Sequence, residues 1–267
     1  MTRKIKPELV CELPVHAASG LVITRDHFYI VADDELSLLI RDKKGKCSLY
    51  VLWEGELPED VMERKKIKPD LESLFLFEDK LYAVPSGSKK NRTMGARIKL
   101  DSSGKILGHE DADFEGLFKK LKTEIDDLNI EGAFSHGKDL FLFQRGNGKE
   151  GINAMITVKD WPSTKFSVKE IKLPLHKNVP LTITDATMVE DEIYFLAVAE
   201  ATESTYLDGE ILGAFFGKLR KGEAQDLTQL DMKGKPEGLA SHSDGYFYIV
   251  TDDDSRDIPS RLLRFLL

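Results

Sequence analysis

The chain has 267 residues, of which 41% are hydrophobic and 31% charged, and its formal net charge is −8 at pH 7. This length can bury a sizeable core, and the negative balance argues against a broad basic face for nucleic acid. No stretch approaches the roughly 20 consecutive apolar residues that a membrane-spanning helix needs. The basic start, Met1–Pro7, lacks the apolar run of a secretory leader. We therefore expect a cytoplasmic protein, or a secreted or periplasmic one if a leader has been removed, with neither nucleic-acid nor membrane partners.

Five segments share one pattern: a polar or acidic residue, a small residue, an apolar run, a polar turn and an aromatic strand. Each segment is typical of a β-hairpin, because turn residues separate two runs rich in β-branched and aromatic side chains. The segments begin at residues 19, 72, 131, 184 and 237, at spacings of 53, 59, 53 and 53. A regular period of this kind indicates a repeat architecture.

Two further strands follow each hairpin. They are expected at Leu36–Arg41 and Cys47–Trp53 in the first period, at Ala154–Val158 and Lys165–Leu173 in the third, and at Ile211–Leu219 and Ala224–Leu230 in the fourth. Four antiparallel strands in about 50 residues are the layout of a β-propeller blade. The last period ends after a third strand, Arg261–Leu267, while Glu8–Val15 has no blade of its own. We expect Glu8–Val15 to complete the fifth blade, because an unpaired edge invites aggregation.

One segment, Phe114–Ile125, has apolar residues at helical spacing, and an inserted helix there explains the longer second period. The sequence thus predicts an all-β fold, a five-bladed β-propeller forming a single domain over residues 1–267, with one helix near 114–125. The competing interpretation is a β-sandwich or a meander of similar hairpins. The expected core includes Leu74, Tyr82, Phe134, Phe141, Tyr194, Leu239 and Tyr248.

In a propeller the first strand of each blade lines the central channel, so equivalent positions face one another around it. That ring would hold Ser19, Glu72, Glu131, Thr184 and Glu237, with Asp185 in place of Thr184 if one turn is shorter. Converging carboxylates must take up protons, spread into water or share a cation. Oxygen ligands suit a hard divalent cation, Ca²⁺ first, or Mg²⁺ with retained waters. The alternative is that these acids accept hydrogen bonds from free backbone amides and bind only water.

The loops that follow the second strands should surround the same end of the channel. They carry basic residues and acidic residues, namely Lys89, Lys90, Arg92, Arg145, Lys149 and Arg256 beside Asp33, Asp34, Asp252 and Asp254. Together with a cation, such side chains could hold a phosphate or carboxylate. The candidate ligand-binding residues are Arg92, Arg145, Asn147, Asp252 and Arg256. Ordinary loop polarity is the competing interpretation.

Other motifs carry no chemistry. The stretch Gly146–Gly151 matches G-x-G-x-x-G but precedes a strand instead of the helix that a dinucleotide site needs. The acidic run Thr251–Arg256 lacks the turn glycine and distal glutamate of an EF-hand loop. The two cysteines, Cys11 and Cys47, are expected to be free thiols.

The repeated hairpin, most clearly Pro236–Ala240 with Asp244–Asp252, resembles the esterase-like propellers related to phytases. The ring, with hydroxyl residues at 19 and 184 and glutamates at 72, 131 and 237, is similar to that of calcium-activated apyrases. Those are five-bladed propellers whose central calcium is bound by serine and glutamate residues, and they hydrolyse nucleoside di- and triphosphates. The resemblance implies a bacterial branch of such propellers. No apyrase nucleotide pocket matches residue by residue, and the apyrases enter the secretory pathway.

We therefore expect a ligand site at the mouth of the channel, for cation-dependent binding or hydrolysis of a phosphorylated or other anionic small molecule. As a metal-dependent hydrolase, the protein would hold the cation on the ring glutamates and offset substrate charge with an arginine. Asp185 and Asp252 would be the candidate bases. The alternative is a non-catalytic scaffold, which an exposed apolar patch on the loop face would favour. A monomer is expected, since a closed propeller leaves no free edge.

Overall fold

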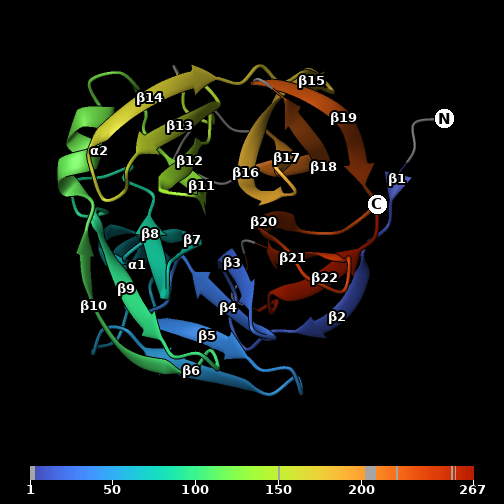
Figure 1. Ribbon diagram of the computed structural model, residues 1–267. Coiled ribbons are helices and arrows are strands. Elements are labelled where there is room, and N and C mark those ends of the chain that lie inside the picture. The colour runs from blue at the N-terminus through green and yellow to red at the C-terminus, as the bar shows by residue number, and fades with distance from the viewer. Residues whose placement is uncertain (1–3, 150, 202–208, 221, 254, 256) are drawn as a thin grey trace.

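A computed structural model describes residues 4–149, 151–201, 209–220, 222–253, 255 and 257–267. Its strands form five sheets arranged in a ring, each beginning with a strand near the ring axis (Figure 1). Within each blade, consecutive strands pair antiparallel, as alternating runs joined by short turns require. The predicted all-β, five-bladed propeller is confirmed.

The first three blades each contain four strands in chain order. Blade 1 is β3 (Ala18–Thr24), β4 (His27–Ala32), β5 (Ser37–Arg41) and β6 (Cys47–Val51). Blade 2 is β7 (Leu71–Phe77), β8 (Lys80–Pro85), β9 (Met94–Leu100) and β10 (Ile106–Asp113). Blade 3 is β11 (Ile130–His136), β12 (Asp139–Gln144), β13 (Ala154–Lys159) and β14 (Lys165–Glu170).

The last two blades each include a strand from the N-terminal end of the chain. Blade 4 is β16 (Val179–Val189), β17 (Glu192–Ala201), β18 (Glu210–Arg220) and β19 (Glu223–Leu230), extended by β15 (Leu175–His176) and, parallel to β19, by β1 (Lys4–Ile5). Blade 5 is β20 (Lys235–Ser241), β21 (Phe247–Asp252), β22 (Arg261–Phe265) and β2 (Glu8–Glu12). The pairing of β2 with β22 confirms the predicted closure of the ring by the N-terminal strand.

The core is divided among the boundaries between blades. Each first strand contacts the first strands of both neighbouring blades, which closes the ring around its axis. Five apolar clusters follow, one at each boundary. Six of the seven predicted core residues are buried, whereas Phe141 is half-buried and packs at the rim of the cluster between blades 3 and 4.

The predicted helix exists as α2 (Glu115–Leu121), and it buries Leu117, Phe118 and Leu121 in the cluster between blades 2 and 3. A second helix, α1 (Val61–Ile67), was not expected from the sequence. It buries none of its residues, and its apolar residues Val61, Met62 and Ile67 do not recur at helical spacing. Asp60 caps the helix by accepting the N–H of Glu63 at 2.9 Å. None of the helices in the described ranges combines the length and apolarity needed to cross a membrane.

Candidate functional site

Every first strand carries a β-bulge at the same place, near the end where the strand begins. The pairing with the second strand skips one residue in each blade, namely Ser19, Glu72, Glu131, Thr184 and Glu237. A bulge leaves the extra residue outside the regular pairing and redirects its side chain. The predicted ring is therefore a ring of five equivalent bulge residues, and Thr184, not Asp185, holds the fourth position.

The two hydroxyl residues of the ring join neighbouring blades. Ser19 Oγ donates to the carbonyl of Leu71 at 2.5 Å, and Thr184 Oγ1 donates to that of Pro236 at 2.6 Å. Each acceptor directly precedes the bulged glutamate of the next blade. The hydroxyl protons are thus committed to the backbone, which aligns consecutive first strands.

Asp185 is turned towards main-chain amides. It is buried, its Oδ1 accepts the N–H of Ala186 at 2.7 Å, and its Oδ2 accepts the N–H of Leu239 at 2.6 Å. Burial raises the pKa of Asp185, and these amide bonds partly offset the rise. This residue follows the alternative expectation, in which an acid satisfies free backbone amides.

The three ring glutamates differ in their partners. Glu131 accepts a hydrogen bond from Asn129 Nδ2 at 2.6 Å, and Glu237 Oε1 lies 2.9 Å from Lys235 Nζ. Glu72 receives no hydrogen bond or direct ion pair from the described part of the chain. Glu72 is therefore the ring glutamate whose carboxylate has no direct partner among the described residues.

Burial, together with the nearness of other carboxylates, disfavours ionisation of the three ring glutamates. It raises the pKa of Glu72 well above the usual range, and the charges of Glu131 and Asp70 raise it further, against the opposing charge of Lys68. Burial also raises the pKa of Glu131, and it raises that of Glu237 to about 8. The ring therefore favours positive charge, supplied by protons or by a cation.

Basic side chains partly supply that charge. We define the axial cluster as the seven carboxylates and four bases gathered at this end of the ring: Asp33, Asp70, Glu72, Glu131, Glu200, Glu237, Asp252, Lys68, Arg92, Arg145 and Lys235. With all groups ionised, carboxylates outnumber bases by three. Low solvent access strengthens these interactions.

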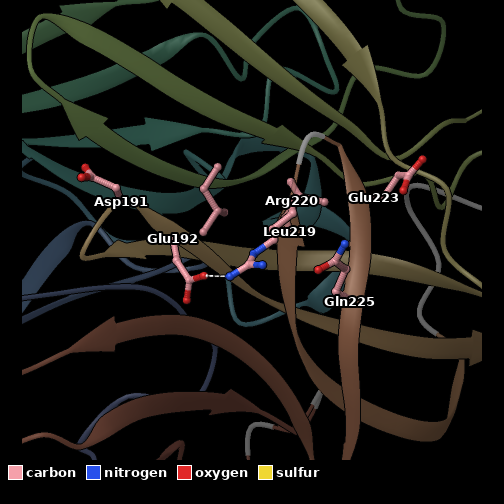
Figure 2. A pocket seen from close by; sticks show the side chains of 7 residues that line it. Asp191, Glu192, Leu219, Arg220, Glu223 and Gln225 are labelled. Atoms are coloured by element: carbon pink, nitrogen blue, oxygen red, sulfur yellow. Dashed lines mark hydrogen bonds and ion pairs between the residues drawn. The ribbon is translucent and has the colours of Figure 1, made fainter.

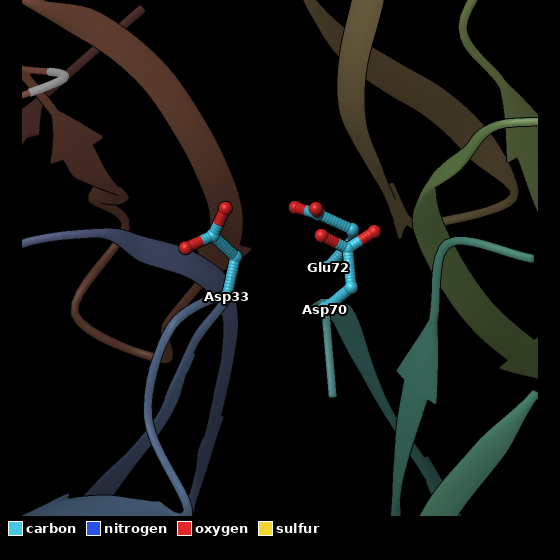
Figure 3. A group of neighbouring side chains, drawn as sticks. All are labelled: Asp33, Asp70 and Glu72. Atoms are coloured by element: carbon cyan, nitrogen blue, oxygen red, sulfur yellow. The ribbon is translucent and has the colours of Figure 1, made fainter. Parts of the chain in front are cut away.

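On the side of blades 1 and 2, the cluster centres on Asp70. Its Oδ1 lies 3.1 Å from Lys68 Nζ, and its Oδ2 lies 2.7 Å from Arg92 Nη1. Lys68 Nζ also contacts Asp33. Figure 3 shows Asp33 opposite Asp70 and Glu72. Within the described ranges, these three residues are the one group of acidic, histidine or cysteine side chains whose ligand atoms all lie within 4.8 Å of one another.

On the side of blades 3 to 5, Arg145 is the central base. Its Nη2 contacts Glu200, its Nη1 lies 3.5 Å from Glu131 Oε1, and its Nε donates to Thr182 Oγ1 at 3.3 Å. The guanidinium is buried and committed to these partners. The structure therefore brings Arg145 to the ring, as predicted, but as a counter-charge for its acids.

The remaining predicted ligand residues lie near the same ring. Asn147 Oδ1 accepts from Asn129 Nδ2 at 3.3 Å, and Asp252 Oδ2 lies 3.9 Å from Lys235 Nζ. Arg92 is buried against Asp70 and also donates to Ser88 Oγ at 2.9 Å. Arg256 and Asp254 lie outside the described residues.

A family model matches residues 14–267 of this chain, and its description is "Family of unknown function (DUF6929)". The chain belongs to the DUF6929 family. Among curated proteins, no sequence matches it. Its fold is similar to that of luciferin-regenerating enzyme, with a TM-score of 0.51 and 9% identity over 98% of this chain and 95% of that one. It is also similar to an α-L-arabinofuranosidase from Podospora anserina, with a TM-score of 0.51 and 10% identity over 98% and 96%. At these identities the likeness shows the propeller fold alone.

Several residues in or beside the axial cluster of this DUF6929 chain were missed from sequence. Asp70 and Lys235 each precede a ring glutamate by two positions, and Asn129 does the same for Glu131. This shared spacing of two residues was an available signal. Lys68 and Glu200 lack such a signal, because they reach the cluster from a helix end and from the end of β17.

A separate surface pocket of about 570 Å³ lies at the other end of blade 4. It is lined by Asp191, Glu192, Ile193, Leu219, Arg220, Glu223 and Gln225 (Figure 2). Hydrogen bonds from Arg220 and Lys218 lower the pKa of Glu192 to about 2. No predicted site residue of the DUF6929 chain lies there, since β17 carries Glu192 at one end and Glu200 of the axial cluster at the other.

Proposed function

We propose that the axial cluster binds a divalent cation, with Ca²⁺ as the first candidate, and that the bound cation recruits an anionic small molecule. The supporting observation is the excess of seven carboxylates over four bases in the axial cluster around Glu72. With all groups ionised, an anionic ligand alone would meet net negative charge there. A divalent cation supplies the charge that the carboxylates lack and gives an anion a partner.

Asp33, Asp70 and Glu72 are the proposed ligands. Their oxygens lie within 4.8 Å of one another, and carboxylate oxygens suit a hard cation. Glu131 and Glu237 border the site, while each keeps a partner of its own. Ser19 and Thr184 shape the ring through the backbone bonds of their hydroxyls.

The geometry supports binding more directly than hydrolysis. Arg92 and Arg145, which would offset charge on a reacting phosphate, are paired with acids of the cluster. Asp185 directs both carboxylate oxygens to main-chain amides, so it is not poised as a general base. Hydrolysis of a phosphorylated substrate, with an activity like that of apyrases, is the finer form of this proposal. Phosphate release from ATP in the presence of Ca²⁺ tests it.

The experiment for cation binding is thermal unfolding of metal-free protein with added Ca²⁺ or Mg²⁺. A ligand present at 100 times its Kd stabilises the native state by about 2.7 kcal/mol, so Tm should rise with concentration. Glu72→Gln should remove most of the rise. Glu78→Gln, at the turn that ends β7 away from the cluster, removes the same charge and should leave the rise intact. A wild-type Tm that does not change with Ca²⁺, Mg²⁺ or chelator would refute the proposal.

A protein-interaction scaffold remains the second candidate, because α1 exposes apolar side chains. Val61 is 53% exposed, Met62 50% and Ile67 57%. Exposed apolar groups near a functional site favour contact with another protein. If Met62→Ser and Ile67→Ser together abolish a stable complex while the Ca²⁺ response persists, the scaffold function is supported separately.

A further inference from the structure

Lys68 lies inside the group of acids proposed to hold the cation. Its Nζ contacts Asp33 and lies 3.1 Å from Asp70 Oδ1, and its charge opposes the rise in the pKa of Glu72. The Lys68 side chain is 8% exposed. Burial opposes its charge, but Asp33 and Asp70 outweigh burial and raise the pKa of Lys68, so the ammonium stays protonated.

Helix α1 carries Lys68 to this position. Lys68 is the C-cap residue of α1, and its N–H donates to the carbonyl of Arg64 at 2.8 Å. The helix is attached mainly by polar contacts: Arg64 donates to the carbonyls of Pro58 at 2.8 Å and Asp34 at 3.1 Å, and Asn91 donates to that of Lys66 at 2.9 Å. An element that buries no residue opens at lower cost than the core strands.

Building on the proposed cation site, we propose that Lys68 is a tethered competitor of the cation. Its ammonium holds the position among Asp33, Asp70 and Glu72 that a divalent cation would take. Two positive centres repel each other across such short distances. Cation binding therefore requires Lys68 to leave, and α1 is the element whose movement releases it.

The other bases of the cluster do not fit this role. Arg92 contacts Asp70 but also donates to Ser88 and to the carbonyl of Lys65 at 3.1 Å, so its planar group has partners elsewhere. Lys235 contacts Glu237 from within strand β20 of a five-blade ring. Among the described bases, Lys68 is the one that contacts two of the three proposed ligands.

Calorimetric titration of the metal-free full chain with CaCl₂ tests the proposal. Lys68→Met keeps the length of the side chain and removes its charge, and the Kd for Ca²⁺ should fall by roughly tenfold or more. Lys66→Met removes a charge from the same helix, where Lys66 pairs with Glu63 at 2.6 Å on the surface, and should leave Kd unchanged. Lys68→Arg keeps the charge and should not tighten binding.

The outcomes separate the two proposals. Equal Kd values for the wild type and Lys68→Met would overturn the competitor role while the cation site stands. Absence of Ca²⁺ binding in both proteins would overturn the site and the competitor together. Binding by Lys68→Met alone would support the position of Lys68 at the cation site, but it would overturn the proposed binding of the cation by the wild type.

A measurement on the wild type covers the case in which Lys68→Met does not fold. Brief acetylation with acetic anhydride, read by peptide mass spectrometry, reports the accessibility of each lysine. Saturating Ca²⁺ should raise the labelling of Lys68 severalfold, since the displaced ammonium enters solvent, and should leave Lys66 unchanged. Constant or reduced labelling of Lys68, in protein that binds Ca²⁺, would overturn the competitor role.

Discussion

The carboxylate of Asp185 accepts the main-chain N–H of Leu239 at 2.6 Å, across the boundary between blades 4 and 5. Asp185 directly follows the bulge residue of its strand. The equivalent residue is glycine in three other blades, Gly20, Gly132 and Gly238, and Ser73 in blade 2. The first strands of neighbouring blades approach each other closely at this position. Blade 4 is the one blade in which a carboxylate stands there and bonds to the main chain of the next blade.

Asp185→Asn should destabilise the fold. One of the two oxygens would become an NH₂ group facing a main-chain N–H, so a buried donor would lose its acceptor. The expected loss in the free energy of unfolding is about 1–3 kcal/mol, measured by urea denaturation. Asp191→Asn, at an 86% exposed side chain, should change little. Unchanged stability combined with a lost Ca²⁺ response would instead make Asp185 a cation ligand.

A pair of glycine substitutions tests the tight boundary. In Gly132→Ala the new methyl group would lie 2.8 Å from Asp185 Oδ1 and 3.0 Å from Ala186 N, so we expect a loss of about 1–3 kcal/mol. Gly116→Ala adds a methyl group at an exposed position of α2 with no atom within 4 Å, and should stabilise by about 0.5–1 kcal/mol. Urea denaturation of both variants provides the comparison. Equal effects of the two changes would contradict a close approach at Gly132.

Glu237 should make the stability of metal-free protein depend on pH. Its pKa is raised from 4.5 to about 8 in the folded state, so the folded chain holds a proton that the unfolded chain releases. This stabilisation is complete below pH 4.5 and is lost as pH rises towards 8. With chelator present, the free energy of unfolding should fall between pH 6 and pH 8, a range that lies inside this window. Glu237→Gln should reduce that slope, and a variant with the slope of the wild type would exclude Glu237 as its source.

The β-propeller could be predicted from the sequence because its signals are local. Hairpin strands pair with neighbours in the chain, and alternation sets which side chains face the core. Even β2, which pairs with β22 at the far end of the chain, followed from the incomplete fifth period. Helix α1 was missed because it lacks an apolar stripe, although Asp60 and Glu63 have the spacing of a helix N-terminal capping pair.

The sequence by itself determined that Glu72, Glu131 and Glu237 occupy equivalent positions around the axis, since the repeat period places them there. Only the tertiary structure decided their charge partners. Lys68 meets Asp33 across 35 residues, and Arg145 meets Glu200 across 55 residues, each pair joining different blades or a helix to a blade. Which acid a basic side chain reaches depends on how neighbouring blades are oriented and where each side chain ends in space. Strand periodicity does not determine those directions. The carboxylate of Glu72, which lacks a direct partner among the described residues, and the nearby ammonium of Lys68 could therefore be identified only in the folded structure.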